Sequence, residues 1–111
     1  MKYAFPAIFE QDKNGIAVYF PDDESIVTCG DNLEEAIFMA EDVLNLALWD
    51  REEDNEDIPT PSKIEDIKLA PNQMIKMIYA DTEAYAKQVA EKNDNLLTNN
   101  YSNDWNINLN V

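Results

Sequence analysis

The sequence predicts an α+β fold: a three- to four-stranded, mainly antiparallel sheet with a long helix packed on one face and a short C-terminal helix. Two observations carry this prediction. Short β-prone runs separated by turns fill the first 30 residues. A longer run with apolar residues at three- and four-residue spacing follows them. With 111 residues, of which 45% are hydrophobic, the chain is long enough for one domain with a modest core.

The β-prone runs predict three successive strands, at residues 3–9, 16–20 and 25–29. Asn14-Gly15 readily takes the positive φ angles of a tight hairpin, so the first two strands should pair antiparallel. The third should continue the meander. Pro6 lacks a backbone N–H, and for this reason the first strand is expected at an edge of the sheet or at a bulge.

A long helix is expected from Leu33 to about Trp49. Asn32 can cap its N-terminus, and Glu35 can return a hydrogen bond to the N–H of the capping residue. The apolar positions form one broad stripe that should lie on the sheet: Leu33, Ala36, Ile37, Ala40, Val43, Leu44, Ala47 and Leu48.

The second half of the chain predicts one more strand and one more helix. Residues 74–79 are β-prone and should complete the sheet, and residues 84–91 should form the short helix after an acidic first turn. Residues 1–92 are thus expected to form the domain. Residues 93–111 include eight Asn and are expected to be a disordered tail, or one added strand with Trp105, Ile107, Leu109 and Val111 on one face.

The charge balance is the first indication of function. The chain has 23 Asp and Glu against 8 Lys and Arg, which gives a net charge of −15. Such a surface repels phosphate backbones and attracts basic partners, although solubility alone is an alternative explanation. The sequence shows neither a signal-peptide pattern nor a long apolar stretch, so a cytoplasmic location is expected.

The composition argues against most kinds of catalysis. The chain has no His, and its single Cys29 is expected to be a small buried apolar residue. With only two glycines it offers no loop that could hold a phosphate. A magnesium-dependent nuclease would need converging carboxylates, but residues 2–9 and 16–20 carry none. No catalytic, cofactor or metal site is therefore expected.

Five segments, in order and spacing, resemble the N-terminal domain of the HicB antitoxins. They are FPAIFE at residues 5–10, GIAVYFPD at 15–22, VTCGDNLEEA at 27–36, IPTPS at 58–62 and DTEAY at 81–85. The run at residues 30–36 is the most characteristic. The resemblance covers roughly residues 1–90.

This resemblance implies a partly degenerate ribonuclease-H-like fold without the metal-binding acids of that fold. HicB proteins pair with HicA, a small basic toxin that cleaves messenger RNA with a histidine, and they neutralise the toxin by covering its active site. The implied function is therefore that of an antitoxin and not of an enzyme. Two alternatives stay open: an orphan acidic domain with another basic partner, and a residual magnesium-dependent nuclease.

The end of the chain departs from the family pattern. Typical HicB proteins end in a ribbon-helix-helix or helix-turn-helix domain that binds DNA, which requires Lys or Arg for phosphate contacts. Residues 93–111 contain neither. The sequence therefore gives no support to direct DNA binding.

Exposed acids and large apolar groups on the predicted helix are the candidates for partner binding. The acids should pair with charges of a basic toxin, and the two aromatic residues should act as anchors. The candidates are Glu34, Phe38, Glu41, Asp42, Trp49, Glu52, Glu53 and Asp54. For the acids the alternative is a solvated surface, and for the aromatic residues it is burial under a later segment. A homodimer or higher oligomer, formed through a sheet edge or the helix, is also expected.

Overall fold

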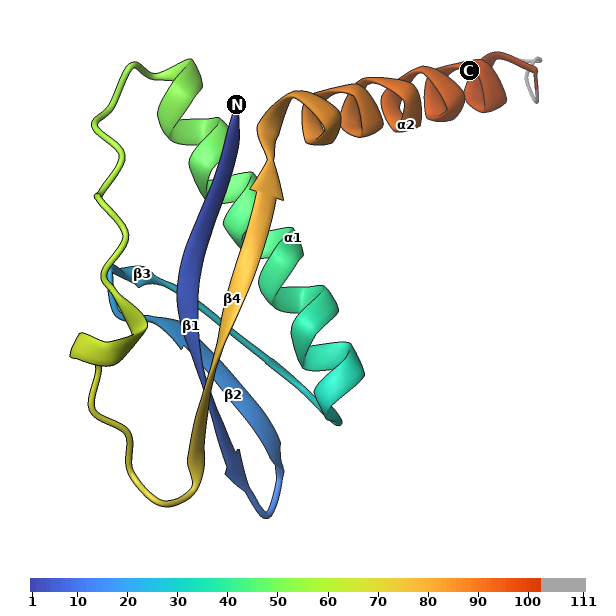
Figure 1. Cartoon of the computed structure of the whole chain (residues 1–111). Coiled ribbons are helices and arrows are strands. Elements are labelled where there is room, and N and C mark those ends of the chain that lie inside the picture. Colours follow the sequence, from blue (N-terminus) through green and yellow to red (C-terminus); the bar gives the residue numbers. More distant parts are fainter. Residues whose placement is uncertain (103–111) are drawn as a thin grey trace.

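The computed structural model describes the backbone of residues 1–102 and the side chains of residues 1–92. Its four strands form one antiparallel sheet in the order β3-β2-β1-β4, and a long helix crosses one face (Figure 1). The strands are β1 (Lys2–Asp12), β2 (Gly15–Phe20), β3 (Asp23–Gly30) and β4 (Gln73–Asp81). The helices are α1 (Leu33–Glu53), the single turn η1 (Ile64–Asp66) and α2 (Thr82–Ser102). The predicted α+β architecture is confirmed.

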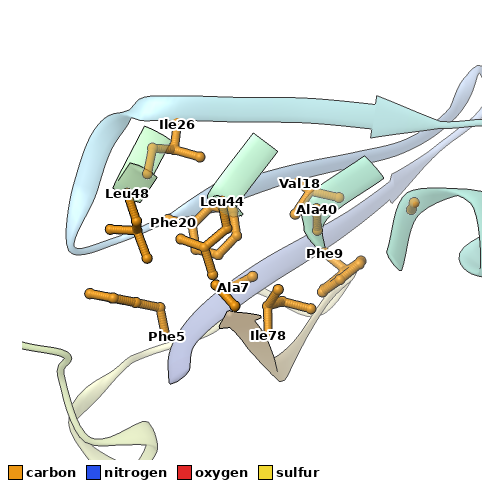
Figure 2. Packing of buried hydrophobic residues seen from close by; sticks show 12 residues of the cluster. Phe5, Ala7, Phe9, Val18, Phe20, Ile26, Ala40, Leu44, Leu48 and Ile78 are labelled. Carbon is orange, nitrogen blue, oxygen red and sulfur yellow. The ribbon is translucent and has the colours of Figure 1, made fainter. Parts of the chain in front are cut away.

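The core lies between the sheet and α1. Alternate side chains of the strands point to the helix, and they pack against the apolar stripe that the sequence of the helix predicts. Figure 2 shows this layer, which contains Phe5, Ala7, Phe9, Val18, Phe20, Ile26, Ala36, Ala40, Leu44, Leu48, Ile78 and Ala80. The small Ala36 and Ala40 let the first half of the helix approach the strands closely, whereas Leu44 and Leu48 fill the space under the second half.

The N-terminus of α1 is capped as predicted, with one difference. The Asn32 Oδ1 atom accepts a hydrogen bond of 2.9 Å from the N–H of Glu35. The Glu35 carboxylate in turn accepts a hydrogen bond of 2.7 Å, but from the N–H of Asp31 and not from that of Asn32. The two bonds fix the angle at which the chain passes from β3 into the helix.

The expectation of an edge position for the first strand is wrong, because β1 lies inside the sheet between β2 and β4. Pro6 is tolerated there for a reason that the strand order reveals. It faces Met77 of β4 in register, while pairing with β2 begins only at Ile8. On the β2 side of Pro6 there is thus no registered partner that needs an N–H.

Cys29 is exposed, so its predicted burial is wrong. Side chains alternate along β3, and Ile26 points to the helix and is buried. Val27 and Cys29 are an odd number of residues from Ile26, so their side chains point away from α1 and are exposed to solvent. The composition of a five-residue run could not indicate which of its residues the helix would cover.

Both helices extend beyond their predicted ends. Helix α1 continues to Glu53, and α2 continues to Ser102, well past the expected end at residue 91. The rest of the predicted tail, including Trp105, Ile107, Leu109 and Val111, lies outside the described residues. Within the described residues, no helix is long and apolar enough to cross a membrane.

Candidate partner-binding groove

A groove opens where α1, β4 and α2 meet, and we name it the α1–β4 groove. It has a volume of about 320 Å³. Its lining comes from all three elements: Phe38, Glu41, Asp42, Asn45, Tyr79, Asp81, Ala84, Tyr85 and Gln88. Three of the eight candidate residues, Phe38, Glu41 and Asp42, are therefore brought together here.

Hydrogen bonds fix the frame of the groove. Asn45 of α1 accepts a bond of 2.9 Å from the N–H of Asp81 at the end of β4, and its amide donates to the Glu41 carbonyl at 2.9 Å. The Asp81 carboxylate accepts from the N–H of Ala84 at 3.1 Å, which caps the first turn of α2. Helix, strand end and second helix are thus held together by two polar side chains.

Two aromatic side chains of the groove face solvent. Phe38 is 65% exposed and Tyr79 is 66% exposed, although both are large enough to favour burial. They come from different elements and line the same hollow. Exposed aromatic groups of this kind are typical anchors of protein interfaces.

The other two aromatic residues near the groove contact each other. Trp49 and Tyr85 meet edge to face with ring centroids 5.8 Å apart, and both are half-buried. Burial, together with the charge of Asp42, raises the pKa of the Tyr85 hydroxyl. Trp49 thus packs under a later segment, as the alternative reading of the sequence had it.

The other candidate acids lie outside the groove. Glu34 is exposed on the first turn of α1, and Glu53 and Asp54 are exposed at its end. Glu52 has a structural contact, because its carboxylate accepts a hydrogen bond of 2.5 Å from the Tyr3 hydroxyl. The candidate acids are therefore spread over both ends of α1 and the groove.

Sequence reasoning missed Asn45, Tyr79, Asp81 and Tyr85. Two of these left a signal. Asn45 follows Glu41 by four residues on the exposed face of α1, and Tyr79 lies between Ile78 and Ala80 in a β-prone run, where alternation predicts that it faces away from them. Asp81 and Tyr85 join the site through contacts between distant segments. No local pattern indicates such contacts.

A larger hollow of about 1060 Å³ lies around the β1–β2 turn, the start of α1 and the start of β4. Its lining mixes Asp12 and Asp31 with the base Lys13, and its exposed apolar groups are Leu33 and Met74. We favour the α1–β4 groove as the partner site because it combines exposed aromatic residues with acids and its lining includes no base.

Glu52 and Tyr3 join the end of α1 to the start of β1. The N-terminal ammonium donates to the Thr82 hydroxyl at 2.9 Å and lies 4.0 Å from the Glu52 carboxylate. The hydrogen bond from Tyr3 lowers the pKa of Glu52. Burial, and then the hydrogen bond and charge of Glu52, raise the pKa of Tyr3 to about 12.

Removing the Tyr3 hydroxyl should reduce the stability of the fold, by an amount that depends on pH. We expect Tyr3→Phe to lower the free energy of unfolding by about 1–2 kcal/mol near pH 7, because a hydrogen bond to a charged group is lost at a partly exposed site. The folded pKa of Glu52 lies below its ordinary value, so the ionised carboxylate stabilises the fold above the ordinary pKa. That contribution disappears as the pH falls through the lowered pKa, and the two proteins should then converge.

Urea unfolding of both proteins at neutral and at acid pH measures this difference. Tyr79→Phe is the matched control, since the exposed Tyr79 makes no hydrogen bond with another described side chain. A loss for Tyr3→Phe that is the same at both pH values would show that the carboxylate is not involved.

The comparisons with known proteins agree on one family. The family described as "HicB_like antitoxin of bacterial toxin-antitoxin system" matches residues 2–70. Antitoxin HicB 2 of Photorhabdus laumondii is 48% identical over 58 residues, which cover 52% of this chain and 42% of that relative. The match thus spans less than half the length of the curated relative.

Solved structures show the same fold. A toxin–antitoxin complex from Streptococcus pneumoniae contains a chain that is 26% identical with a TM-score of 0.70, over 77% of this chain and 73% of that one. A chain of the HicA3 and HicB3 toxin–antitoxin complex is similar in fold, with a TM-score of 0.59 at 15% identity over 71% of this chain and 99% of that one. The protein belongs to the HicB-like antitoxin family, as the resemblance of its sequence predicted.

Proposed function

We propose that the chain is an antitoxin, not an enzyme, and that it binds and neutralises a small basic HicA-type toxin that cleaves messenger RNA. The observation that carries the proposal is the α1–β4 groove, where exposed aromatic residues stand beside acids in a chain of net charge −15. The similar structures from Streptococcus pneumoniae and of HicA3 and HicB3 are toxin–antitoxin complexes. They support the proposed class of partner.

The groove suits a basic protein for two physical reasons. The negative potential of the whole chain speeds encounter with a cationic partner. Glu41 and Asp42 can then pair with Lys or Arg, while Phe38 and Tyr79 supply apolar anchors. Bases of the toxin that pair with these acids are no longer free to bind RNA phosphates, so binding and inhibition are linked.

The proposal predicts that the groove, and not net charge alone, determines affinity. Phe38→Ala should weaken binding of a HicA-type toxin by about 10- to 100-fold, because an interface anchor is lost. The double change Glu41→Lys/Asp42→Lys should weaken it by a similar factor, because it reverses the two groove charges. Calorimetry measures the affinity, and RNA cleavage by the toxin measures inhibition.

Each variant has a matched control. Leu46→Ala truncates another exposed apolar residue of α1, and Glu65→Lys/Asp66→Lys makes the same change in net charge on η1. Equal losses in the groove and control variants would reject the groove as the binding site. A folded wild-type chain that neither binds nor inhibits an active toxin would reject the proposed function and favour a different basic partner.

The residual nuclease receives no support from the described residues. These residues contain no group of three or more Cys, Asp or Glu side chains placed to hold a metal ion. The homodimer or higher oligomer, the cytoplasmic location and the division into residues 1–92 and 93–111 stay predictions. Light scattering of the purified chain tests the oligomer.

A further inference from the structure

Strand β4 is an edge of the sheet, and its outer backbone groups are open over its middle. At the ends of the β1–β4 pairing, the Gln11 N–H donates to the Asn72 carbonyl and the Thr82 N–H to the Met1 carbonyl, both at 3.0 Å. Hydrogen-bonded pairs alternate along an antiparallel ladder, so the even-numbered residues of β4 bond to β1. Its odd-numbered residues direct their N–H and C=O groups outward.

The two outermost of these N–H groups have partners. The Gln73 N–H donates to the Ala70 carbonyl at 3.0 Å, and the Asp81 N–H donates to Asn45 at 2.9 Å. Within the described part of the chain, the outward N–H groups of Ile75, Met77 and Tyr79 have none. Three consecutive outward positions are therefore free to pair with another strand.

This open edge runs into the α1–β4 groove. Figure 1 shows α1 passing alongside β4, and Tyr79 lines the groove together with Phe38 and Glu41 of the helix. Proteins often protect such an edge with a bulge, and the other edge pairing, β2 with β3, has a register shift at Tyr19 and Phe20. The β1–β4 pairing is regular throughout.

We propose that β4 receives an extended segment of the basic toxin as a fifth strand of the sheet. The inference rests on the proposed function and specifies how the partner is held. Main-chain hydrogen bonds to the outward groups would supply affinity, and side chains of the added strand would supply specificity. In the groove these side chains would meet Phe38 and the acids of α1 together with Tyr79 of β4.

Charge decides which occupant fits this edge. A segment with Lys or Arg can pair with Glu41 and Asp42, which make no ion pair within the described residues. A second copy of this chain would instead bring the same acids together and would add another net charge of −15. The groove therefore favours the basic partner over self-pairing.

Amide hydrogen exchange of the full chain, alone and with the toxin, tests the proposal without any substitution. The N–H groups of Ile75, Met77 and Tyr79 should gain at least about tenfold protection in the complex, because each acquires a hydrogen bond. Those of Lys76 and Ile78 already bond to β1 and serve as internal controls. The comparison separates strand addition from a general stabilisation of the sheet.

A substitution provides a second test. Met77→Pro removes the central outward N–H and puts a ring in the path of an added strand, and we expect about 10- to 100-fold weaker toxin binding. Met77→Val keeps the N–H and should bind within about threefold of wild type. Circular dichroism verifies that both variants fold.

The outcomes distinguish this inference from the proposed function. If wild type binds and inhibits the toxin but the three amides exchange as in the free chain, strand addition is wrong and the proposed function stands. If protection appears in the chain alone and grows with its concentration, the occupant is a second copy and the inference is also overturned. If wild type does not bind the toxin at all, both fail.

Discussion

Replacing Leu44 by alanine is expected to lower the free energy of unfolding by about 3–5 kcal/mol, a large part of the about 5–15 kcal/mol that stabilises a typical small domain. Leu44 is 1% exposed and lies in the apolar layer between α1 and the sheet (Figure 2). Its neighbours on the stripe, Ala40 and Leu48, are also buried, so the structure cannot easily collapse into the cavity that the substitution leaves.

Leu46 provides the control on the same helix. It is 48% exposed, and Leu46→Ala should cost less than about 1 kcal/mol. Urea unfolding followed by circular dichroism measures both variants. Similar losses at the two positions would mean that α1 does not lie on the sheet as described.

The fold could be predicted because its determinants are local. The four buried residues of α1, Ala36, Ala40, Leu44 and Leu48, all belong to the stripe predicted from spacing. The hairpin turn also forms where predicted, although of Asn14 and Gly15 only Gly15 has a positive φ angle. The place of β1 within the sheet was not predictable, because it depends on the pairing with β4 and therefore on segments about 70 residues apart.

The site could be predicted only in part, for the same reason. Helical spacing places Phe38, Glu41 and Asp42 away from the buried stripe, and this is why the sequence identified them. Asp81 and Tyr85 reach the groove only because β4 ends beside α1 and α2 begins there. Their position follows from tertiary packing and leaves no local pattern.

The structure also shows which acids are bonded within the fold and which are not, a difference that the sequence does not reveal. Asp23 bonds to Arg51 in the last turn of α1, and Asp22 accepts from the N–H of Ser62 at 2.9 Å in the loop that follows. The two acids thus hold the end of α1 and the loop after it against the sheet. Burial alone would raise the pKa of Asp23, but hydrogen bonds from Ser25 and the charge of Arg51 outweigh it and lower the pKa. Such acids stabilise the fold, whereas Glu41 and Asp42 of the α1–β4 groove make no ion pair within the described residues and are available to the proposed partner.

Gly30→Ala is the second substitution expected to have a large effect. It should lower the free energy of unfolding by about 3 kcal/mol or more. A Cβ at this position would lie 2.5 Å from the N atom and 2.7 Å from the Cα atom of Ala36, and 3.0 Å from the carbonyl carbon of Glu35. All three are backbone atoms of the first turn of α1. The helix would have to move away, which would strain the hydrogen bonds of Asn32 and Glu35 that cap it.

This close contact gives a physical reason for the run at residues 30–36, the most characteristic part of the family resemblance. Gly30 permits the approach, Asn32 and Glu35 cap the helix, and the fully buried Ala36 keeps the contact small. Val27→Ala, at a 62% exposed position of the same strand, is the control and should cost less than about 1 kcal/mol. If urea unfolding finds Gly30→Ala as stable as that control, the close contact between β3 and α1 does not explain the residues at positions 30–36.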